Sequence, residues 1–180
     1  MHIRAVASAF RFVVSLVAVA APAAAMAVEP RVGADVSWTS IKVAGEAFNP
    51  LAARLRLALA LTPEWEIGAL GGGGFADDSN VTVNVALGSF YAGYVSYSAS
   101  LDDNARLALN VGYGSTMLDV TSPLPGFPGS ETYSGVVYGL SLQERLARHP
   151  HWIGSLDFER WYKKDGLVIN EVSYGFRREF

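Results

Sequence analysis

The chain has 180 residues, a net charge of −3 and no cysteine. The weakly acidic balance, without a basic patch, argues against a nucleic-acid-binding protein. The lack of cysteine excludes a disulfide framework and a thiolate metal site.

The first 27 residues have the layout of a secretory signal peptide. Arg4 and Arg11 precede a short apolar run at residues 12–21, and Pro22 and a series of small residues follow it. Ala25-Met26-Ala27 fits the small-x-small pattern, which predicts cleavage after Ala27. The alternative, a membrane anchor, needs about 20 apolar residues, and this run is shorter. We therefore expect an exported chain in which residues 28–180 form one domain.

After Glu29 the sequence alternates with a period of two, which indicates β-strands. The clearest example is residues 51–61, where leucines such as Leu55 and Leu57 alternate with Arg54, Arg56 and alanines. A helix would place Leu55 and Leu57 on different faces. Because no second long apolar run occurs, a helical membrane protein is excluded, but a membrane barrel is not. Eight strands are expected, near residues 30–43, 51–61, 65–70, 81–97, 106–114, 135–146, 152–159 and 172–180.

Glycine, proline and acidic clusters predict the connections. Residues 62–64 and 102–104 read as tight turns, and residues 163–166 read as a hairpin loop. The four glycines at residues 71–74 predict a flexible or bulged stretch that ends the third strand. Residues 119–132 contain three prolines, which a central strand does not accept, so they predict the longest loop.

The last strand alternates up to Phe180. Val172, Tyr174, Phe176 and Phe180 share one face, and the opposite face carries Ser173, Gly175, Arg177 and Glu179. An uncovered strand edge is an aggregation hazard, so we expect this strand to pair with the first one and close the sheet. The predicted fold class is therefore all-β, an eight-stranded antiparallel up-and-down transmembrane β-barrel.

The two faces differ in a way that indicates which one points inward. One face holds long aliphatic side chains, whereas the other holds small residues among a few long charged ones, which suits a narrow lumen. The lumen charges are five arginines and six acids, namely Arg54, Arg56, Arg106, Arg145, Arg177, Asp35, Glu66, Asp157, Glu159, Glu171 and Glu179. Buried charges must pair, so we expect a plugged, ion-paired core without an open pore.

Aromatic residues near the strand ends predict two girdles around the apolar band. One would contain Trp65, Tyr97, Trp152 and Phe180, and the other Trp38, Tyr113, Tyr138 and Tyr162. Strict alternation also places Glu144, Arg160 and Arg178 on the lipid face. Because these residues lie near strand ends or the outer rim, their charged groups can reach the membrane interface. The alternative explanation is a bulge that changes the alternation.

Several stretches resemble the small OmpA/OmpX-like porin-family proteins of the outer membrane. The Gly/Tyr-rich segment at residues 85–94, the polar turn at 101–107 and Gly112-Tyr113-Gly114 are similar to the family's central hairpin. Residues 138–143 resemble its sixth strand. The resemblance implies an outer-membrane location, both termini in the periplasm, inner turns at residues 62–64, 101–104 and 147–151, and outer loops at 44–49, 71–80, 119–132 and 163–166.

The resemblance also implies partners. The terminal residues Tyr174, Gly175, Phe176 and Phe180 are similar to the signal read by the outer-membrane assembly machinery, although Arg178 stands where that signal usually has an apolar residue. Other expected partners are outer-membrane lipids and lipopolysaccharide, and a surface ligand of the outer loops. The implied role is structural or surface-exposed, including adhesion.

Candidates for chemistry are few, and we predict no enzyme, no cofactor and no metal site. His149 and His151 fall in a predicted turn without further ligands nearby. A lipid A-modifying enzyme is the alternative, but the deacylase pattern of a His and a Ser two residues apart is missing after His151. A soluble lipocalin-like binder is the remaining alternative, and it would place the apolar face inside.

Overall fold

The computed structural model describes residues 28–43, 45–79, 83–121, 129–164 and 166–180. The signal peptide predicted at residues 1–27 lies outside these ranges. In the described part of the chain, no helix is long and apolar enough to cross a membrane.

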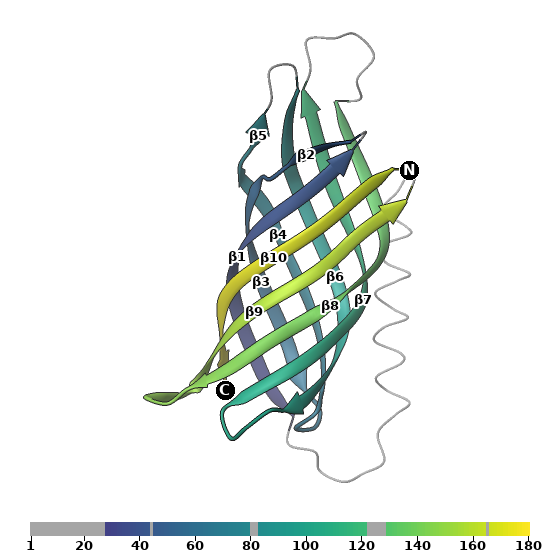
Figure 1. Ribbon diagram of the computed structural model, residues 1–180. Coiled ribbons are helices and arrows are strands. Elements are labelled where there is room, and N and C mark those ends of the chain that lie inside the picture. Colours follow the sequence, from purple (N-terminus) through teal and green to yellow (C-terminus); the bar gives the residue numbers. More distant parts are fainter. Residues whose placement is uncertain (1–27, 44, 80–82, 122–128, 165) are drawn as a thin grey trace.

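Eight long antiparallel strands of the described residues form a closed barrel (Figure 1). They are β1 (Glu29–Val43), β3 (Leu51–Ala60), β4 (Trp65–Ala76), β6 (Asn84–Ser100), β7 (Ala105–Thr121), β8 (Ser130–Leu146), β9 (His149–Lys164) and β10 (Leu167–Glu179). The short strands β2 (Glu46–Phe48) and β5 (Asp78–Ser79) pair with β1 and β6. The predicted fold class is confirmed.

The last strand closes the barrel against the first. β10 pairs with β1 in an unbroken register from Arg31 opposite Glu179 to Lys42 opposite Val168. β1 and β10 therefore each have a hydrogen-bonded neighbour on both sides, so neither strand leaves an open sheet edge. Figure 1 shows the two strands side by side although they lie at opposite ends of the chain.

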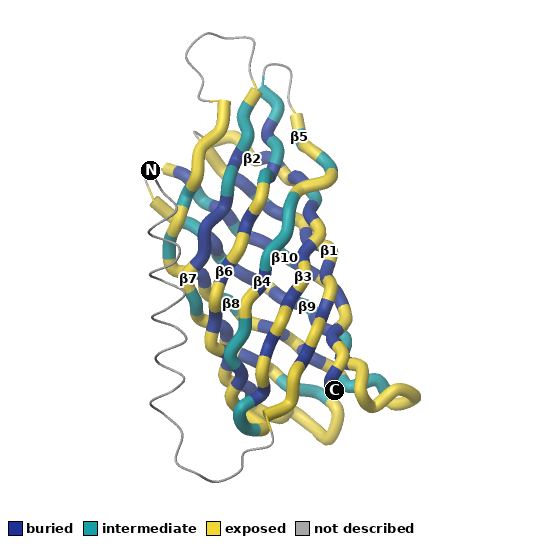
Figure 2. Tube along the Cα trace, turned by 180° about the vertical axis from the view of Figure 1, so that it is seen from behind, coloured by how far each residue is buried: buried dark blue, intermediate teal, exposed yellow. Residues whose placement is uncertain are grey.

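Burial alternates along most strands, as Figure 2 shows by the change between dark blue and yellow. In β3, Arg54 and Arg56 are buried, whereas Leu55 and Leu57 are 66% and 60% exposed. The polar face is thus inside and the apolar face outside, the reverse of a soluble barrel. Trp65, Tyr97, Trp152 and Phe180 are exposed near one end of the strands, and Trp38, Tyr113 and Tyr138 lie further along on the same outer surface.

The two ends of the barrel differ in their connections. We call the end with the short connections at residues 61–64, 101–104 and 147–148 the turn end, and the opposite end, toward β2 and β5, the loop end. Glu29 and Glu179 both lie at the turn end, because β1 starts there and β10 finishes there. The turns predicted at 62–64 and 101–104 are confirmed, but β9 already begins at His149, so the third turn is shorter than predicted.

Residues 71–74 do not end a strand, which corrects the predicted strand end, although a bulge does follow directly after Gly74. β4 continues through all four glycines to Ala76, in register with β3 up to Gly74 and with β6 up to Gly73, and its register against β3 shifts between Gly74 and Ala76. At Gly72 an added Cβ would lie only 2.7 Å from Cζ of Phe90. Glycine is needed here because an added Cβ would meet the backbone oxygen of Ala53 on β3, and because the Phe90 ring occupies the space inside the wall.

A bulge in β6 reverses part of the predicted alternation. The register against β7 shifts between Leu87 and Phe90, so that Val85 and Leu87 are buried on the same side as Phe90. Strict alternation through the strand predicted at residues 81–97 places Val81, Val85 and Leu87 on the lipid face with Tyr91, and this is wrong for Val85 and Leu87 because one extra residue changes the side on which the preceding residues point. Val81 of the same predicted face lies outside the described residues.

A second irregularity lies between β9 and β10. The register shifts between Ile169 and Asn170, and Tyr162 packs against Tyr133 with ring centroids 5.2 Å apart. Both rings contact the buried apolar cluster, so Tyr162 is not part of the outer girdle as predicted. Arg160, beside the shift, stays on the outer face and donates from Nε to Oδ1 of Asn170 at 2.9 Å.

The predicted outer loops are largely taken up by strands. β2 occupies residues 46–48, β5 occupies 78–79, and β9 extends to Lys164. β7 and β8 remain paired up to Asp119 and Ser130, so the loop predicted at 119–132 is shorter than expected. Its three prolines lie outside the described residues.

Candidate functional site

The charged lumen residues come from one side of the barrel. β9, β10, β1, β3 and β4 supply the long charged side chains, whereas β6, β7 and β8 face them mainly with small or neutral residues such as Ser96, Asn110 and Ser141. Small residues on one wall leave the volume that arginines from the other wall need to cross a narrow lumen. At Gly139, for example, a Cβ would lie 2.9 Å from Cγ of Glu159.

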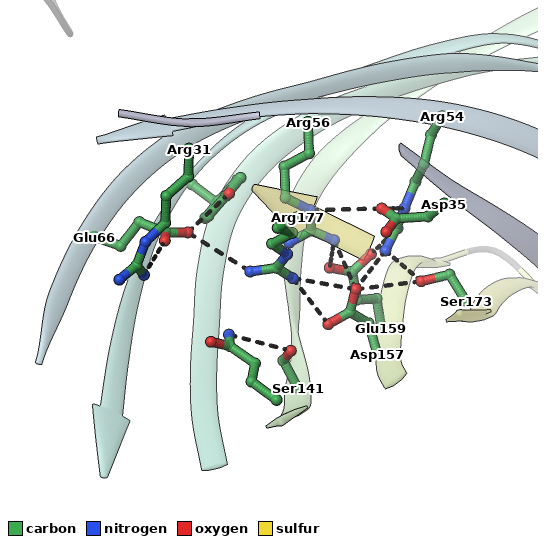
Figure 3. A network of polar contacts seen from close by, with 12 residues as sticks. Arg31, Asp35, Arg54, Arg56, Glu66, Ser141, Asp157, Glu159, Ser173 and Arg177 are labelled. Carbon is green, nitrogen blue, oxygen red and sulfur yellow. Dashed lines mark hydrogen bonds and ion pairs between the residues drawn. The ribbon is translucent and has the colours of Figure 1, made fainter. Parts of the chain in front are cut away.

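Arg54 forms ion pairs with four carboxylates, and Figure 3 shows it beside Asp35 and Ser173. Its Nε is 2.8 Å from Oδ2 of Asp35, and its Nη2 is 2.8 Å from Oδ2 of Asp157 and also donates to the Ser173 hydroxyl. Its Nη1 is 2.6 Å from Oε2 of Glu159 and 2.7 Å from Oε1 of Glu171. The side chain of Arg54 is fully enclosed, so four carboxylates surround one buried guanidinium.

Asp157 connects three arginines. Its Oδ2 accepts from Nη2 of Arg54 and Nη2 of Arg56, each at 2.8 Å, and its Oδ1 lies 3.3 Å from Nη2 of Arg177. The guanidinium of Arg56 also lies 5.3 Å from the ring centroid of Tyr94, a cation–π distance. One carboxylate therefore holds three cations together in the middle of the lumen.

The ion pairs continue from this centre to the turn end. Nη1 of Arg177 lies 3.8 Å from Oε1 of Glu66, which also accepts from the Tyr94 hydroxyl at 3.1 Å. Arg31 connects two acids: its Nη1 lies 2.9 Å from Oε2 of Glu66, and its Nη2 lies 2.6 Å from Oε1 of Glu179. Arg145, about one third exposed, is 2.7 Å from the other oxygen of Glu179 and marks the rim. We call the buried members of this series the ionic network: Arg31, Asp35, Arg54, Arg56, Glu66, Asp157, Glu159, Glu171, Arg177 and Glu179.

The structure brings most of the predicted lumen residues into one connected cluster. Arg106 is the exception, because its Nη1 donates to the backbone oxygen of Pro63 at 2.9 Å, at the rim of the turn end. Sequence reasoning missed Arg31 and Tyr94. Both could have been found from alternation alone, since Arg31 lies two residues before Gly33, and Tyr94 lies between the inward-facing Ala92 and Ser96.

The loop end of the lumen is built differently. Its buried side chains are mostly apolar, and we call the set Ile41, Phe48, Val85, Leu87, Phe90, Leu118, Trp161, Leu167 and Ile169 the loop-end core. Phe90 and Trp161 pack edge to face with ring centroids 5.3 Å apart. The two parts of the lumen are therefore filled differently: ion pairs occupy the part toward the turn end, and an apolar core occupies the part toward the loop end.

The outer surface changes polarity at the same level. Beyond the girdle residues Trp38 and Tyr138, outward positions carry mostly polar residues, although Phe75 at 60% exposed, Val136 at 58% exposed and Val168 are apolar exceptions. These polar outward residues include Ser40, Lys42, Ser89, Thr121, Thr132, Ser134, Lys163 and Asn170. At the loop end the barrel thus has the apolar-inside, polar-outside arrangement of a protein in water, whereas its other part has the reverse.

Neither His149 nor His151 belongs to a metal-binding cluster among the described residues. His149 and His151 are exposed at the turn end of β9. Among the described residues, no group of three or more His, Cys, Asp or Glu side chains could hold a metal ion. The enclosed lumen carboxylates face arginines at ion-pair distance, so they are arranged to neutralise charge.

The terminal residues lie on both faces of β10. Tyr174, Phe176 and Phe180 are exposed on the outer surface, and Gly175 is buried against β1. Arg178 is exposed on the same surface, and its guanidinium lies 4.9 Å from the ring centroid of Phe180 and 6.0 Å from that of Trp152. Stacking on aromatic rings gives this charge a favourable place at the interface.

Comparison with known proteins identifies the fold. No family model matches the chain, and no curated protein matches it. Among solved structures, the chain is similar to Ail, the attachment invasion locus protein of Yersinia pestis, with a TM-score of 0.64, 17% identity, and coverage of 85% of this chain and 99% of Ail. Neisserial surface protein A gives a TM-score of 0.63 at 12% identity, covering 84% of this chain and 97% of that one.

The N-terminal β-barrel domain of Pseudomonas aeruginosa OprF is also similar, with a TM-score of 0.50 at 11% identity, covering 81% of this chain and 96% of that domain. At these identities the likeness shows the fold alone. Combined with the apolar girdled exterior, that fold is one for a lipid environment. The chain has the fold of the eight-stranded transmembrane β-barrels of bacterial outer membranes.

Proposed function

We propose that the protein is a non-conducting outer-membrane barrel with a structural or surface-exposed role. The observation that carries this proposal is the enclosure of Arg54 by four carboxylates in the middle of the lumen. Each of these charges needs its partners in a low-dielectric interior, so the network resists the rearrangement that a water-filled path would require. The loop-end core adds a second, apolar obstruction above it.

The surface role rests on the part of the barrel that extends beyond the girdles. Paired strands continue there as far as Asp119 and Ser130, so this region presents a rigid polar surface to the outside. Ail, one of the similar structures, is described in complex with the heparin analogue sucrose octasulfate. Interaction with outer-membrane lipids, and with a further ligand through the outer loops, belongs to the same proposal.

Single-channel recording in planar lipid bilayers tests the closed lumen. The protein is first folded into the bilayer lipid, and heat-modifiable migration on gels verifies the folded barrel. We expect no large, stable single-channel currents from the folded protein. Such currents from a preparation that passes the migration check would contradict the proposal.

A further inference from the structure

Three cations lie together on the outer surface of β1, β9 and β10 at the loop end. Lys42 of β1 is paired with Val168 of β10, which is paired in turn with Lys163 of β9. Lys42 and Lys163 therefore flank Val168 in one row of outward-facing residues, and both are exposed. The next row toward the turn end is formed by Ser40, Asn170 and Arg160 in the same way. We call Lys42, Arg160 and Lys163 the basic face.

Arg160 is held in place but keeps free donors. Its Nε donates to Oδ1 of Asn170 at 2.9 Å, which fixes the plane of the guanidinium. Among the described residues, no hydrogen bond or ion pair is formed by its two terminal nitrogens, and none of the three cations pairs with a carboxylate. A fixed guanidinium with two unused nitrogens is suited to a phosphate group.

The basic face lies directly beside the apolar band. Arg160 is paired with Tyr138 of β8, a girdle residue that is 47% exposed. On β1, the outward residues run in order from Trp38 through Ser40 to Lys42. The cations thus follow immediately after the aromatic girdle, at the level where lipid headgroups meet the hydrocarbon region.

Charge at the loop end is separated between the two sides of the barrel. The described acids Asp77, Asp119 and Glu131 lie on or beside β4, β7 and β8, and Asp78 of β5 accepts a hydrogen bond from the backbone nitrogen of Asn49, next to β2, at 2.6 Å. Near the basic face, Glu46 of β2 lies opposite Val43, beyond the row of Lys42. An anionic molecule in the membrane plane is therefore attracted to the β1–β10–β9 side and repelled from the other.

From these observations we infer that the basic face binds the phosphate group of an anionic lipid in the leaflet at the loop end. The inference rests on the proposed placement in the membrane, and it adds a defined lipid site to it. Phosphate oxygens accept from the lysine ammonium groups and the Arg160 guanidinium, while the acyl chains lie along the apolar surface below Tyr138 and Trp38.

A site-directed fluorescence experiment tests this lipid site. The chain has no cysteine, so bimane can be attached at Ser40→Cys within the basic face, or at the exposed Ser134→Cys on β8 as a matched control. Each labelled protein is folded into phosphatidylcholine vesicles that contain a small amount of 5-doxyl phosphatidic acid or 5-doxyl phosphatidylcholine. The doxyl group quenches bimane only when the lipid lies next to it.

We expect phosphatidic acid to quench bimane at Ser40→Cys more strongly than phosphatidylcholine does. At the water-facing Ser134→Cys we expect only weak quenching, without a preference between the two lipids. The preference at Ser40→Cys should fall about fivefold for each cation replaced in Lys42→Gln, Arg160→Gln and Lys163→Gln, and Arg160→Lys should retain part of it. Arg148→Gln at the turn end, with the same loss of charge, should leave the preference unchanged.

Three results would overturn the inference: no preference at Ser40→Cys, an equal preference at Ser134→Cys, or a preference that survives removal of all three cations. Heat-modifiable migration of each variant separates this outcome from failure of the proposed function. A protein that folds into vesicles without lipid preference contradicts the lipid site alone, whereas a protein that does not fold into vesicles contradicts its membrane placement.

Discussion

The two parts of the lumen solve the problem of a filled barrel in opposite ways. Toward the turn end, arginines and carboxylates such as Arg54 and Asp157 form an ionic network behind a wall of lipid-facing leucines. Toward the loop end, Phe90 and Trp161 belong to an apolar core behind a largely polar wall. Where the inner face changes from charged to apolar, the outer face changes from apolar to largely polar, because the surroundings of the wall change from lipid to water.

The largest effect is expected from removing the central cation of the ionic network. Arg54→Met leaves four buried carboxylates without their common partner, and loss of one member of a buried ion pair costs about 3–5 kcal/mol. Urea unfolding of the barrel in lipid vesicles measures this free energy. Arg148→Met, at an exposed position of the turn end, should change the unfolding free energy by less than about 0.5 kcal/mol. Equal losses in both variants would contradict a stabilising network.

The loop-end core predicts a large effect of a different kind. Leu87→Ala removes buried apolar atoms and leaves a cavity, which costs about 2–5 kcal/mol. Leu57→Ala removes the same atoms from a side chain that is 60% exposed to the surroundings and leaves no cavity, so its cost should be clearly smaller. Unfolding in the same vesicles gives both values. If Leu57→Ala costs as much as Leu87→Ala, the loop end has no separate core.

Within the ionic network, the acids are not equivalent. Glu171 lies opposite Glu159 and shares Nη1 of Arg54 with it, so two carboxylates compete for one nitrogen. Glu171→Gln relieves that repulsion, and we expect it to cost no more than about 1 kcal/mol. Asp157→Asn removes the charge that holds three arginines together and should cost about 3–5 kcal/mol. A reversed order of these two unfolding free energies would contradict the arrangement.

The smallest effect is expected outside the lumen, in the turn at residues 101–104. The Asp102 carboxylate accepts backbone N–H bonds from Asn104 at 2.8 Å and Ala105 at 2.7 Å, which lowers the pKa of this exposed carboxyl. Because the pKa is lower in the folded state, the two hydrogen bonds stabilise the folded barrel fully above the ordinary aspartate pKa of about 4. This stabilisation is lost as the pH falls below that value.

Asp102→Ala should therefore reduce the stability of the barrel at pH 7 and flatten its decline between about pH 4 and more acidic conditions. The measurement is the free energy of urea unfolding, compared between about pH 4 and a more acidic pH. Asp103→Ala is the matched control, because the bonds from Asn104 and Ala105 go to Asp102. A steep decline that is unchanged in Asp102→Ala would rule out this contribution.

Alternation alone predicts the barrel, its closure and the direction of most side chains. It succeeds in β3 and β10, where Arg54, Arg56 and Arg177 point inward without interruption. It fails where a bulge inserts one residue, as between Leu87 and Phe90, because the period of two then places every further residue on the wrong face. The individual ion pairs were also beyond the sequence, since they depend on how far each strand is staggered along its neighbour.

The exchange of polarity between the two parts of the barrel can be tested at three sites by bimane on single cysteines. In vesicles, brominated lipid should quench bimane at Leu109→Cys, aqueous iodide should quench it at Ser134→Cys, and neither should quench it at Leu87→Cys. This result follows if Leu109 faces lipid, Ser134 faces water and Leu87 is enclosed in the loop-end core. Quenching by brominated lipid at Leu87→Cys, or at Ser134→Cys as strongly as at Leu109→Cys, would contradict the account.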